Sequence, residues 1–347
     1  MSFSRRLAVP TLLAVSLLTL TACGEGETGS DPASESPAAS ERGALSIVTS
    51  TNVYGEIASA VGGEDVEVTS IVNSLSQDPH SYEATVQDKL AVSEADLVIE
   101  NGGGYDVFLE RLAEETGVTT VLSAVELSGL EGAEEATDEH AGEEEHAEES
   151  EHAGEEEHAD ESEHAEEEGH GHGSFNEHVW YDLASMMTLA DSIAEELAGL
   201  DEANAEAYRE RAAAFTEDLQ PIQDRLDTLA AEGPGGNVAV TEPVPGYLLE
   251  DAGFENVTPE EFIEAIEEES DVPVAALEEM TTLVSDGSLA FLAYNGQTEG
   301  PQTEAVREAA DEAGLPIVDF TETVPDGEEY VSWMESNLDN IEAALGS

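Results

Sequence analysis

The chain has 347 residues, of which 81 are Asp or Glu and nine are Lys or Arg, so its formal charge is −72. This charge excludes a nucleic-acid-binding protein, because phosphate binding requires clustered cations, and it argues against an anionic membrane surface as the main partner. Hydrophobic residues still make up 40% of the chain, which is enough for a folded core, and the length predicts one large or two medium domains.

Residues 1–22 have the layout of a secretory signal peptide. Two arginines precede an apolar run, Leu7–Leu20, that is too short to span a membrane. The run ends in Leu-Thr-Ala-Cys, which resembles the lipobox of bacterial lipoproteins and implies a lipid anchor on Cys23 at the outer face of the cell membrane. Cys23 is the only cysteine of the chain, which excludes a disulfide framework. Residues 23–43 are predicted to form a flexible tether, and the export route, general secretion or twin-arginine, stays open.

Residues 44–200 are predicted to form a first α/β lobe. Short β-branched runs alternate with helical stretches, and this alternation predicts parallel βαβ units whose sheet is covered on both faces. Strands are expected at Leu45–Thr49, Val66–Val72, Leu97–Glu100 and Val118–Leu122, and helices at Tyr54–Val61 and Tyr105–Glu115.

A long helix and a second lobe are predicted next. Residues 201–232 are rich in Ala, Glu and Leu, and their one proline, Pro221, is expected to kink the helix without ending it. Residues 233–347 then return to the α/β pattern. The expected strands are Asn237–Thr241, Leu289–Tyr294 and Ile317–Phe320, with a helix at Thr303–Ala313. The fold class is therefore α/β, with two lobes that each hold a mainly parallel sheet flanked by helices and that are joined by one long helix.

One further helix start is predicted from its capping residues. In Thr-Pro-Glu-Glu, Thr258 is expected to cap the helix, Pro259 to take its first position and Glu261 to complete a capping box.

Residues 131–173 are the most unusual segment. They hold 20 Asp or Glu residues and no Lys or Arg. Such dense carboxylates favour a solvated, disordered loop. Histidines alternate with the carboxylates and are expected to bind several divalent cations weakly, although a merely solvating insert remains the alternative. These histidines are His140, His146, His152, His158, His164, His170 and His172.

The other two histidines of the chain are His80 and His178. His80 follows the second predicted strand, at the carboxyl edge of the sheet, where ligands usually bind. His178 lies where an apolar helix is predicted to begin. Taken alone, each is more readily a structural or surface histidine than a metal ligand. Trp180 and Trp333 are expected in the core.

Four segments, in this order, resemble the zinc and manganese substrate-binding proteins of ABC importers. The similarity runs from about residue 44 to the C-terminus. It implies a rigid linking helix, a metal ion in the cleft between the lobes, and delivery of that ion to a membrane permease. The expected partners are the ABC permease and ATPase subunits, and the protein is expected to be a monomer without enzymatic activity. An acidic His-rich loop is typical of the zinc-uptake branch. The four segments are Thr51–Ile57, Asp78–Glu83, Asn101–Asp106 and Glu177–Trp180.

The resemblance also implies the metal ligands. His80 and His178 match the first two. The third is expected to be Glu242, after the first strand of the second lobe, because no histidine follows His178. The fourth is usually an aspartate, but the loop that is expected to carry it has none. Glu299 is favoured there, with the Gln297 carbonyl or a water molecule as alternatives.

Two imidazoles with one or two carboxylates accept tetrahedral Zn(II) and can expand to hold Mn(II). The His-rich loop favours zinc, so the expected function is capture of Zn(II) and its delivery to an ABC permease, with a manganese importer component as the alternative. A secreted zinc hydrolase shares the residue types, but the sequence has neither His-Glu-x-x-His nor Gly-x-Ser-x-Gly. A surface metal buffer or adhesin is the third class.

Overall fold

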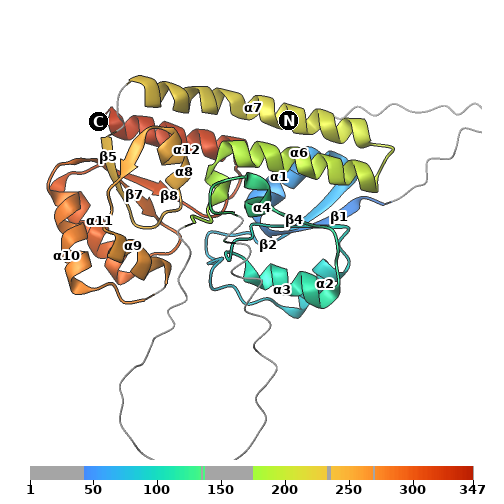
Figure 1. Cartoon of the computed structure of the whole chain (residues 1–347), viewed down its shortest axis with the longest axis horizontal. Coiled ribbons are helices and arrows are strands. Elements are labelled where there is room, and N and C mark those ends of the chain that lie inside the picture. The colour runs from blue at the N-terminus through green and yellow to red at the C-terminus, as the bar shows by residue number, and fades with distance from the viewer. Residues whose placement is uncertain (1–42, 134–135, 137–174, 233–235, 269, 347) are drawn as a thin grey trace, which may run out of the picture. The chain divides into compact units, whose positions relative to one another are not determined.

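The structure is a computed structural model that describes residues 43–133, 136, 175–232, 236–268 and 270–346 (Figure 1). These residues belong to one compact unit, Glu41–Ser347. The predicted signal peptide, Cys23, all but the last residue of the tether, and the seven loop histidines lie outside the described residues. Within the described part, no helix combines the length and apolar character needed to cross a membrane.

The first lobe contains a four-stranded parallel sheet with the order β2-β1-β3-β4. The predicted strands at residues 66–72 and 97–100 are confirmed with their bounds, whereas the fourth strand begins at Val121 and not at Val118. The elements are β1 (Leu45–Thr51), α1 (Asn52–Gly62), η1 (Gly63–Asp65), β2 (Val66–Val72), α2 (Val86–Ser93), β3 (Leu97–Glu100), α3 (Val107–Thr116), β4 (Val121–Ser123) and α4 (Ala124–Ser128).

The second lobe repeats this topology with the parallel order β6-β5-β7-β8. Three of its strands were predicted, and β6, which has only three residues, was not. The elements are β5 (Gly236–Val240), α8 (Gly246–Asp251), β6 (Phe254–Asn256), α9 (Glu260–Glu267), α10 (Val274–Ser285), β7 (Leu289–Asn295), α11 (Pro301–Ala313), β8 (Ile317–Phe320) and α12 (Tyr330–Leu345).

The predicted cap of α9 is wrong. Pro259 is the N-cap residue, and no side chain of the described residues caps the helix. Thr258 instead uses its hydroxyl to accept a hydrogen bond from the Val240 amide at 2.8 Å, at the end of β5. The threonine therefore joins the end of β5 to the residues that follow β6 and does not cap the helix.

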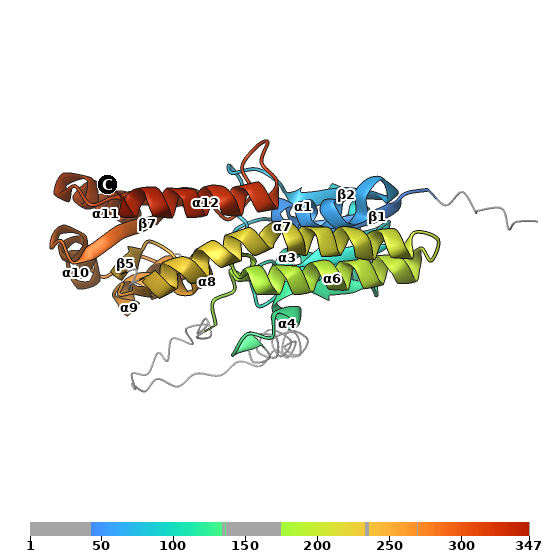
Figure 2. The ribbon, with the colours of Figure 1, turned by 90° about the horizontal axis from the view of Figure 1, so that it is seen from above.

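Helix α7 (Ala205–Glu232) runs along both lobes (Figures 1 and 2). It packs against α6 (Leu183–Leu200) and α1 on the first lobe and against α8 and α12 on the second. Pro221 lies inside α7, so the prediction that it does not end the helix is confirmed. A short 3-10 turn, η3 (Val179–Tyr181), precedes α6.

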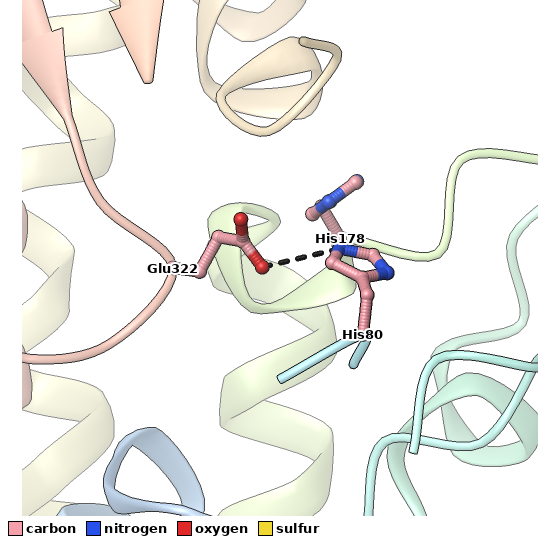
Figure 3. A group of neighbouring side chains, drawn as sticks. All are labelled: His80, His178 and Glu322. Carbon is pink, nitrogen blue, oxygen red and sulfur yellow. Dashed lines mark ion pairs between the residues drawn. The ribbon is translucent and has the colours of Figure 1, made fainter. Parts of the chain in front are cut away.

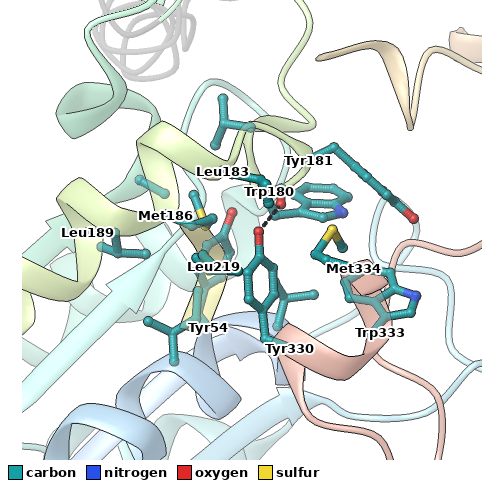
Figure 4. Close-up of a cluster of buried hydrophobic side chains, with 14 of the residues drawn as sticks. Tyr54, Trp180, Tyr181, Leu183, Met186, Leu189, Leu219, Tyr330, Trp333 and Met334 are labelled. Carbon is teal, nitrogen blue, oxygen red and sulfur yellow. Dashed lines mark hydrogen bonds between the residues drawn. The ribbon is translucent and has the colours of Figure 1, made fainter. Parts of the chain in front are cut away.

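The core follows from the alternation of side chains along the strands. Ile47 faces a large apolar cluster that continues through α6, α7 and α12 into the second lobe, whereas its neighbour Val48 faces a smaller cluster under α2 and α3. A third cluster lies under α9, α10 and α11. Trp180 and Trp333 are 1% and 3% exposed, as predicted, and the Tyr330 hydroxyl donates to the Trp180 carbonyl at 2.7 Å (Figure 4).

Because all strands within each sheet are parallel, their carboxyl ends lie at one edge, where ligands bind in open α/β sheets. The loops that follow β2, β3, β5, β7 and β8 begin at these edges and carry most of the residues described next, whereas His178 lies directly before η3.

Candidate metal site

Three side chains from distant parts of the sequence meet between the two lobes (Figure 3). His80 lies in the loop after β2, His178 lies directly before η3, and Glu322 follows β8 by two residues. One ligand atom from each lies within 4.8 Å of the other two. Two imidazole nitrogens and a carboxylate oxygen at this spacing are a donor set that suits a divalent transition metal ion.

His178 is fixed in a single tautomer. Its side chain is buried, and its Nδ1 lies 2.7 Å from the side-chain oxygen of Asn176. The amide nitrogen of Asn176 donates to the Pro243 carbonyl at 2.9 Å, so the amide oxygen must face the ring. Nδ1 therefore carries the proton and Nε2 keeps its lone pair. Nε2 is buried and no described residue forms a hydrogen bond with it, which leaves it free to bind a metal ion.

Glu322 is fully buried, and each of its carboxylate oxygens has a polar side chain as a partner. Oε2 lies 3.2 Å from His80 Nε2 and accepts a hydrogen bond from the Tyr105 hydroxyl at 2.9 Å. Oε1 accepts a hydrogen bond from the Asn295 amide at 2.8 Å. These contacts orient the carboxylate toward both histidines.

The electrostatics of the three residues are dominated by the pairing of Glu322 with His80. Burial would raise the pKa of Glu322, but the hydrogen bond and charge of His80 outweigh it and lower the pKa to about 2. For His80, burial acts in the opposite direction and would lower the pKa, but the hydrogen bond and charge of Glu322 raise it to about 10. Burial lowers the pKa of His178, which therefore stays neutral. The site thus presents one neutral imidazole, one carboxylate, and one imidazole that gives up a proton when a metal ion binds.

A cavity of about 430 Å³ opens beside these residues and is lined by both lobes. Glu242 lies on its wall but outside the group of three. The Asn295 amide and the Thr298 hydroxyl both donate to its carboxylate. Burial, and then the charge of Glu322, raise the pKa of Glu242 to about 7. Because Asn295 donates to both Glu242 and Glu322, Glu242 lies next to the group of three.

The two residues expected as the fourth ligand are not brought into the group. Glu299 also lines the cavity, but it is exposed and accepts a hydrogen bond from the Tyr294 hydroxyl at 3.1 Å. The side-chain carbonyl of Gln297 already accepts hydrogen bonds from the Glu322 and Thr323 amides, at 3.1 and 3.2 Å. The carboxylate that does lie with the two histidines is that of Glu322.

The sequence over residues 47–344 matches the family described as ZnuA, zinc-uptake complex component A, periplasmic. The chain belongs to this family. It is therefore a metal-binding substrate-binding protein of an ABC transporter, in a family of solute-binding proteins. The predicted resemblance and the predicted fold of two parallel-sheet α/β lobes are confirmed.

Relatives of the chain are named for different metals. The manganese-binding lipoprotein MntA of Halalkalibacterium halodurans is 26% identical over 71% of this chain and 68% of its own length. The iron-binding protein YfeA of Yersinia pestis is 24% identical over 74% of this chain and 69% of its own length. Among solved structures, the periplasmic zinc-binding protein TroA of Treponema pallidum has a TM-score of 0.64 at 18% identity, over 87% of this chain and 99% of its own. The likeness to TroA supports the fold alone.

Glu322 is not among the predicted site residues, because the resemblance places the fourth ligand after β7 and as an aspartate. The segment Thr321–Thr323 follows a strand whose bounds, Ile317–Phe320, were predicted correctly. A carboxylate directly after a predicted parallel strand was therefore a signal that could have identified Glu322. Asn176, two residues before a candidate histidine ligand, carried no comparable signal, because its role depends on the distant Pro243 carbonyl.

Replacing Asn176 with leucine is expected to weaken metal binding about 10–100-fold, because loss of a residue that orients a metal-bound histidine has costs of this size in metal affinity. Without the Asn176 oxygen, the Nδ1 proton of His178 loses its acceptor and the ring loses its preferred tautomer. Calorimetry measures the affinity and nitrogen NMR of the histidines reports the tautomer. An unchanged tautomer with unchanged affinity would contradict the assigned role.

Proposed function

We propose that the protein captures Zn(II) outside the cytoplasm and delivers it to the permease of an ABC importer, which consists of permease and ATPase subunits. The observation that carries this proposal is the buried Nε2 of His178, which has no hydrogen-bond partner among the described residues, in a side chain that is grouped with those of His80 and Glu322. A buried polar atom without a hydrogen bond is costly unless a ligand satisfies it. A metal ion bound by these three side chains provides that ligand.

Four residues are proposed to bind the ion. His80, His178 and Glu322 bind it directly, and Glu242 supplies a further oxygen from the cavity wall. This set replaces the predicted one, in which Glu299 was the fourth ligand. The two imidazoles and two carboxylates give a coordination shell that fits Zn(II) and that can also hold Mn(II).

Zinc is proposed over manganese for two reasons. Intrinsic affinity for a given set of nitrogen and oxygen ligands generally ranks zinc above manganese, and imidazole suits zinc well. Seven of the nine histidines also lie in residues 131–173, directly before the Asn176–His178 segment. Manganese stays the second candidate, because MntA, with 26% identity, is named as a manganese-binding lipoprotein.

Competition between the two metals tests this choice. The apo protein is dialysed against equal concentrations of Zn(II) and Mn(II), and the bound metals are counted by mass spectrometry. We expect one tightly bound zinc per chain and less than about a tenth as much manganese, given the affinity order. A chain that retains mostly manganese would overturn the zinc proposal and leave the assignment to the family intact.

The His-rich loop is proposed to collect zinc for the cleft. The predicted segment began at residue 131, but Ala133 is 3% exposed and packs in the core of the first lobe, so the folded lobe extends into it. A deletion of residues 137–173 spares this contact. We expect it to remove several weak zinc sites and to leave the tight site unchanged in calorimetry. The same stoichiometry in excess zinc as for the full chain would show that the loop collects no metal.

The proposed location rests on Cys23 as the site of a lipid that holds the protein, as a monomer, at the outer face of the cell membrane. MntA is named a lipoprotein, which supports this reading. A Cys23→Ser variant is expected to be released into the medium, and a variant that stays in the membrane fraction would contradict the anchor.

A further inference from the structure

The side chain of Gln297 joins two segments that carry proposed metal ligands. Its amide nitrogen donates to the Gln77 carbonyl of the first lobe at 2.7 Å. Its amide oxygen accepts hydrogen bonds from the Glu322 amide at 3.1 Å and from the amide and hydroxyl of Thr323 at 3.2 and 3.1 Å. One side chain of the second lobe therefore contacts the loop that holds His80 and also the segment that holds Glu322.

Each end of this bridge is close to a ligand. Gln77 lies three residues before His80, in a loop tightened by Asp78, which accepts a hydrogen bond from the His80 amide at 2.9 Å. At the other end, the backbone amide of Glu322 donates directly to the side-chain oxygen of Gln297. A shift of Gln297 relative to either segment would thus change the separation between His80 Nε2 and the Glu322 carboxylate, which is 3.2 Å.

The bridge requires an amide. The oxygen end of Gln297 meets only donors, and the nitrogen end meets a carbonyl, so the orientation of the amide is determined. The backbone amide of Gln297 in turn donates to the side-chain oxygen of Asn295 at 2.9 Å, which directs the Asn295 amide toward Glu322 and Glu242. Gln297 is therefore integrated with both proposed carboxylate ligands and does not need a metal ion to satisfy its polar atoms.

A second contact between the lobes differs from this one. Asn52, at the start of α1, donates to the Val324 carbonyl at 2.8 Å and accepts from the Val324 amide at 3.0 Å. This pair holds the Glu322 segment against the first lobe but does not involve the loop that carries His80. Gln297 links the two ligand-bearing segments to each other.

We propose that Gln297 is a positioning residue that holds the His80 loop and the Glu322 segment together across the cleft and thereby slows release of the bound metal ion. Separation of the lobes breaks the hydrogen bond from Gln297 to Gln77 and lets His80 move away from Glu322. The inference rests on the proposed function, because it requires that these residues bind the cargo.

Gln297→Glu tests this role, because it is nearly isosteric and breaks only one side of the bridge. A carboxylate keeps the acceptor contacts with Glu322 and Thr323 but places an oxygen against the Gln77 carbonyl. Loss of this hydrogen bond is expected to speed metal release about tenfold. The added negative charge acts in the opposite direction, because it attracts the cation, so faster release cannot be a charge effect.

Gln302→Glu is the matched control. Gln302 lines the same cavity, and the described residues show no hydrogen bond from it across the cleft. The variant adds the same charge without breaking the bridge and is expected to release metal no faster than the wild type. Release is followed after mixing the zinc-loaded protein with excess chelator. Hydrogen exchange at residues 77–81 is expected to rise in Gln297→Glu, whereas Gln302→Glu leaves it unchanged.

The outcomes separate this inference from the proposed function. If the wild type binds no tight zinc, or if His178→Ala leaves tight binding intact, the proposed function fails first. If the wild type binds zinc through His178 and Gln297→Glu releases it no faster than Gln302→Glu, the positioning role is wrong and the proposed function stands. A lower melting temperature without faster release would assign Gln297 a structural role only and would equally overturn the inference.

Discussion

Replacing Glu322 with glutamine is expected to weaken zinc binding at least about 100-fold, because even residues that only orient a ligand cost about 10–100-fold. The amide keeps the shape of the side chain and its place between Tyr105 and Asn295, but it removes the negative charge and the oxygen that faces His80. Calorimetric titration of the apo protein, with a competing chelator for the wild type, measures the change.

Glu322→Gln also changes the pKa of His80, and this second effect favours zinc binding. In the wild type, Glu322 raises the pKa of His80 to about 10, so at pH 7.5 a proton occupies His80 and zinc must displace it. Glutamine removes this effect and makes His80 easier to deprotonate, which favours zinc binding by the variant. The measured loss of affinity therefore understates the contribution of the carboxylate to metal binding.

Glu299→Gln is the control for Glu322→Gln, because it removes the same charge from the same cavity at a residue outside the group of three. We expect its affinity to lie within about threefold of the wild type, since screened charges at exposed sites contribute little. A double variant with alanine at His80 and His178 is expected to lose the tight site. Equal losses of zinc affinity in Glu299→Gln and Glu322→Gln would show that Glu299 also binds the ion.

The fold was largely predictable because the strands carry a strong and local signal. Ile47 and Val48 face opposite clusters of the first lobe, and short β-branched runs of this kind are typical of strands covered on both faces. β6 was not predictable in the same way, since its three residues include only one buried side chain, Phe254. Its position depends on pairing with β5, which is a tertiary contact.

The site was predictable where the residue type is rare. Only His80 and His178 lie outside the His-rich loop, so the sequence offers just two histidines as ligands of the cleft. The carboxylate ligands could not be chosen in this way, because the chain has 81 acidic residues. Only the structure, which places Glu322 beside His80, separates it from the others. The hydrogen bond from Tyr105 to Glu322 joins residues 217 positions apart, and no local pattern in the sequence encodes it.

Glu100→Gln is expected to stabilise the protein in mildly alkaline solution and to make its stability less dependent on pH. Glu100 ends β3, and its Oε2 is buried with no hydrogen-bond partner in the part of the chain that the structure describes. Burial, followed by the charges of Asp106, Glu110 and Glu126, raises the pKa of Glu100 well above its ordinary value of 4.5. The folded state therefore holds a proton that the unfolded state loses.

The sign of the pH effect follows from that proton. Because the folded state binds more protons above pH 4.5, the stability of the wild type falls as the pH rises, by up to about 1.4 kcal/mol per pH unit, until Glu100 ionises in the folded state. Glutamine is neutral throughout, so the free energy of unfolding of Glu100→Gln, measured with urea, is expected to exceed that of the wild type at pH 8, and this excess is expected to shrink at pH 5. The exposed Glu94→Gln is the control and is expected to change stability by less than about 0.5 kcal/mol at both pH values. A Glu100→Gln variant no more stable than the wild type at pH 8 would contradict this prediction. It would show that the Glu100 carboxyl has a hydrogen-bond partner in solution and does not destabilise the first lobe.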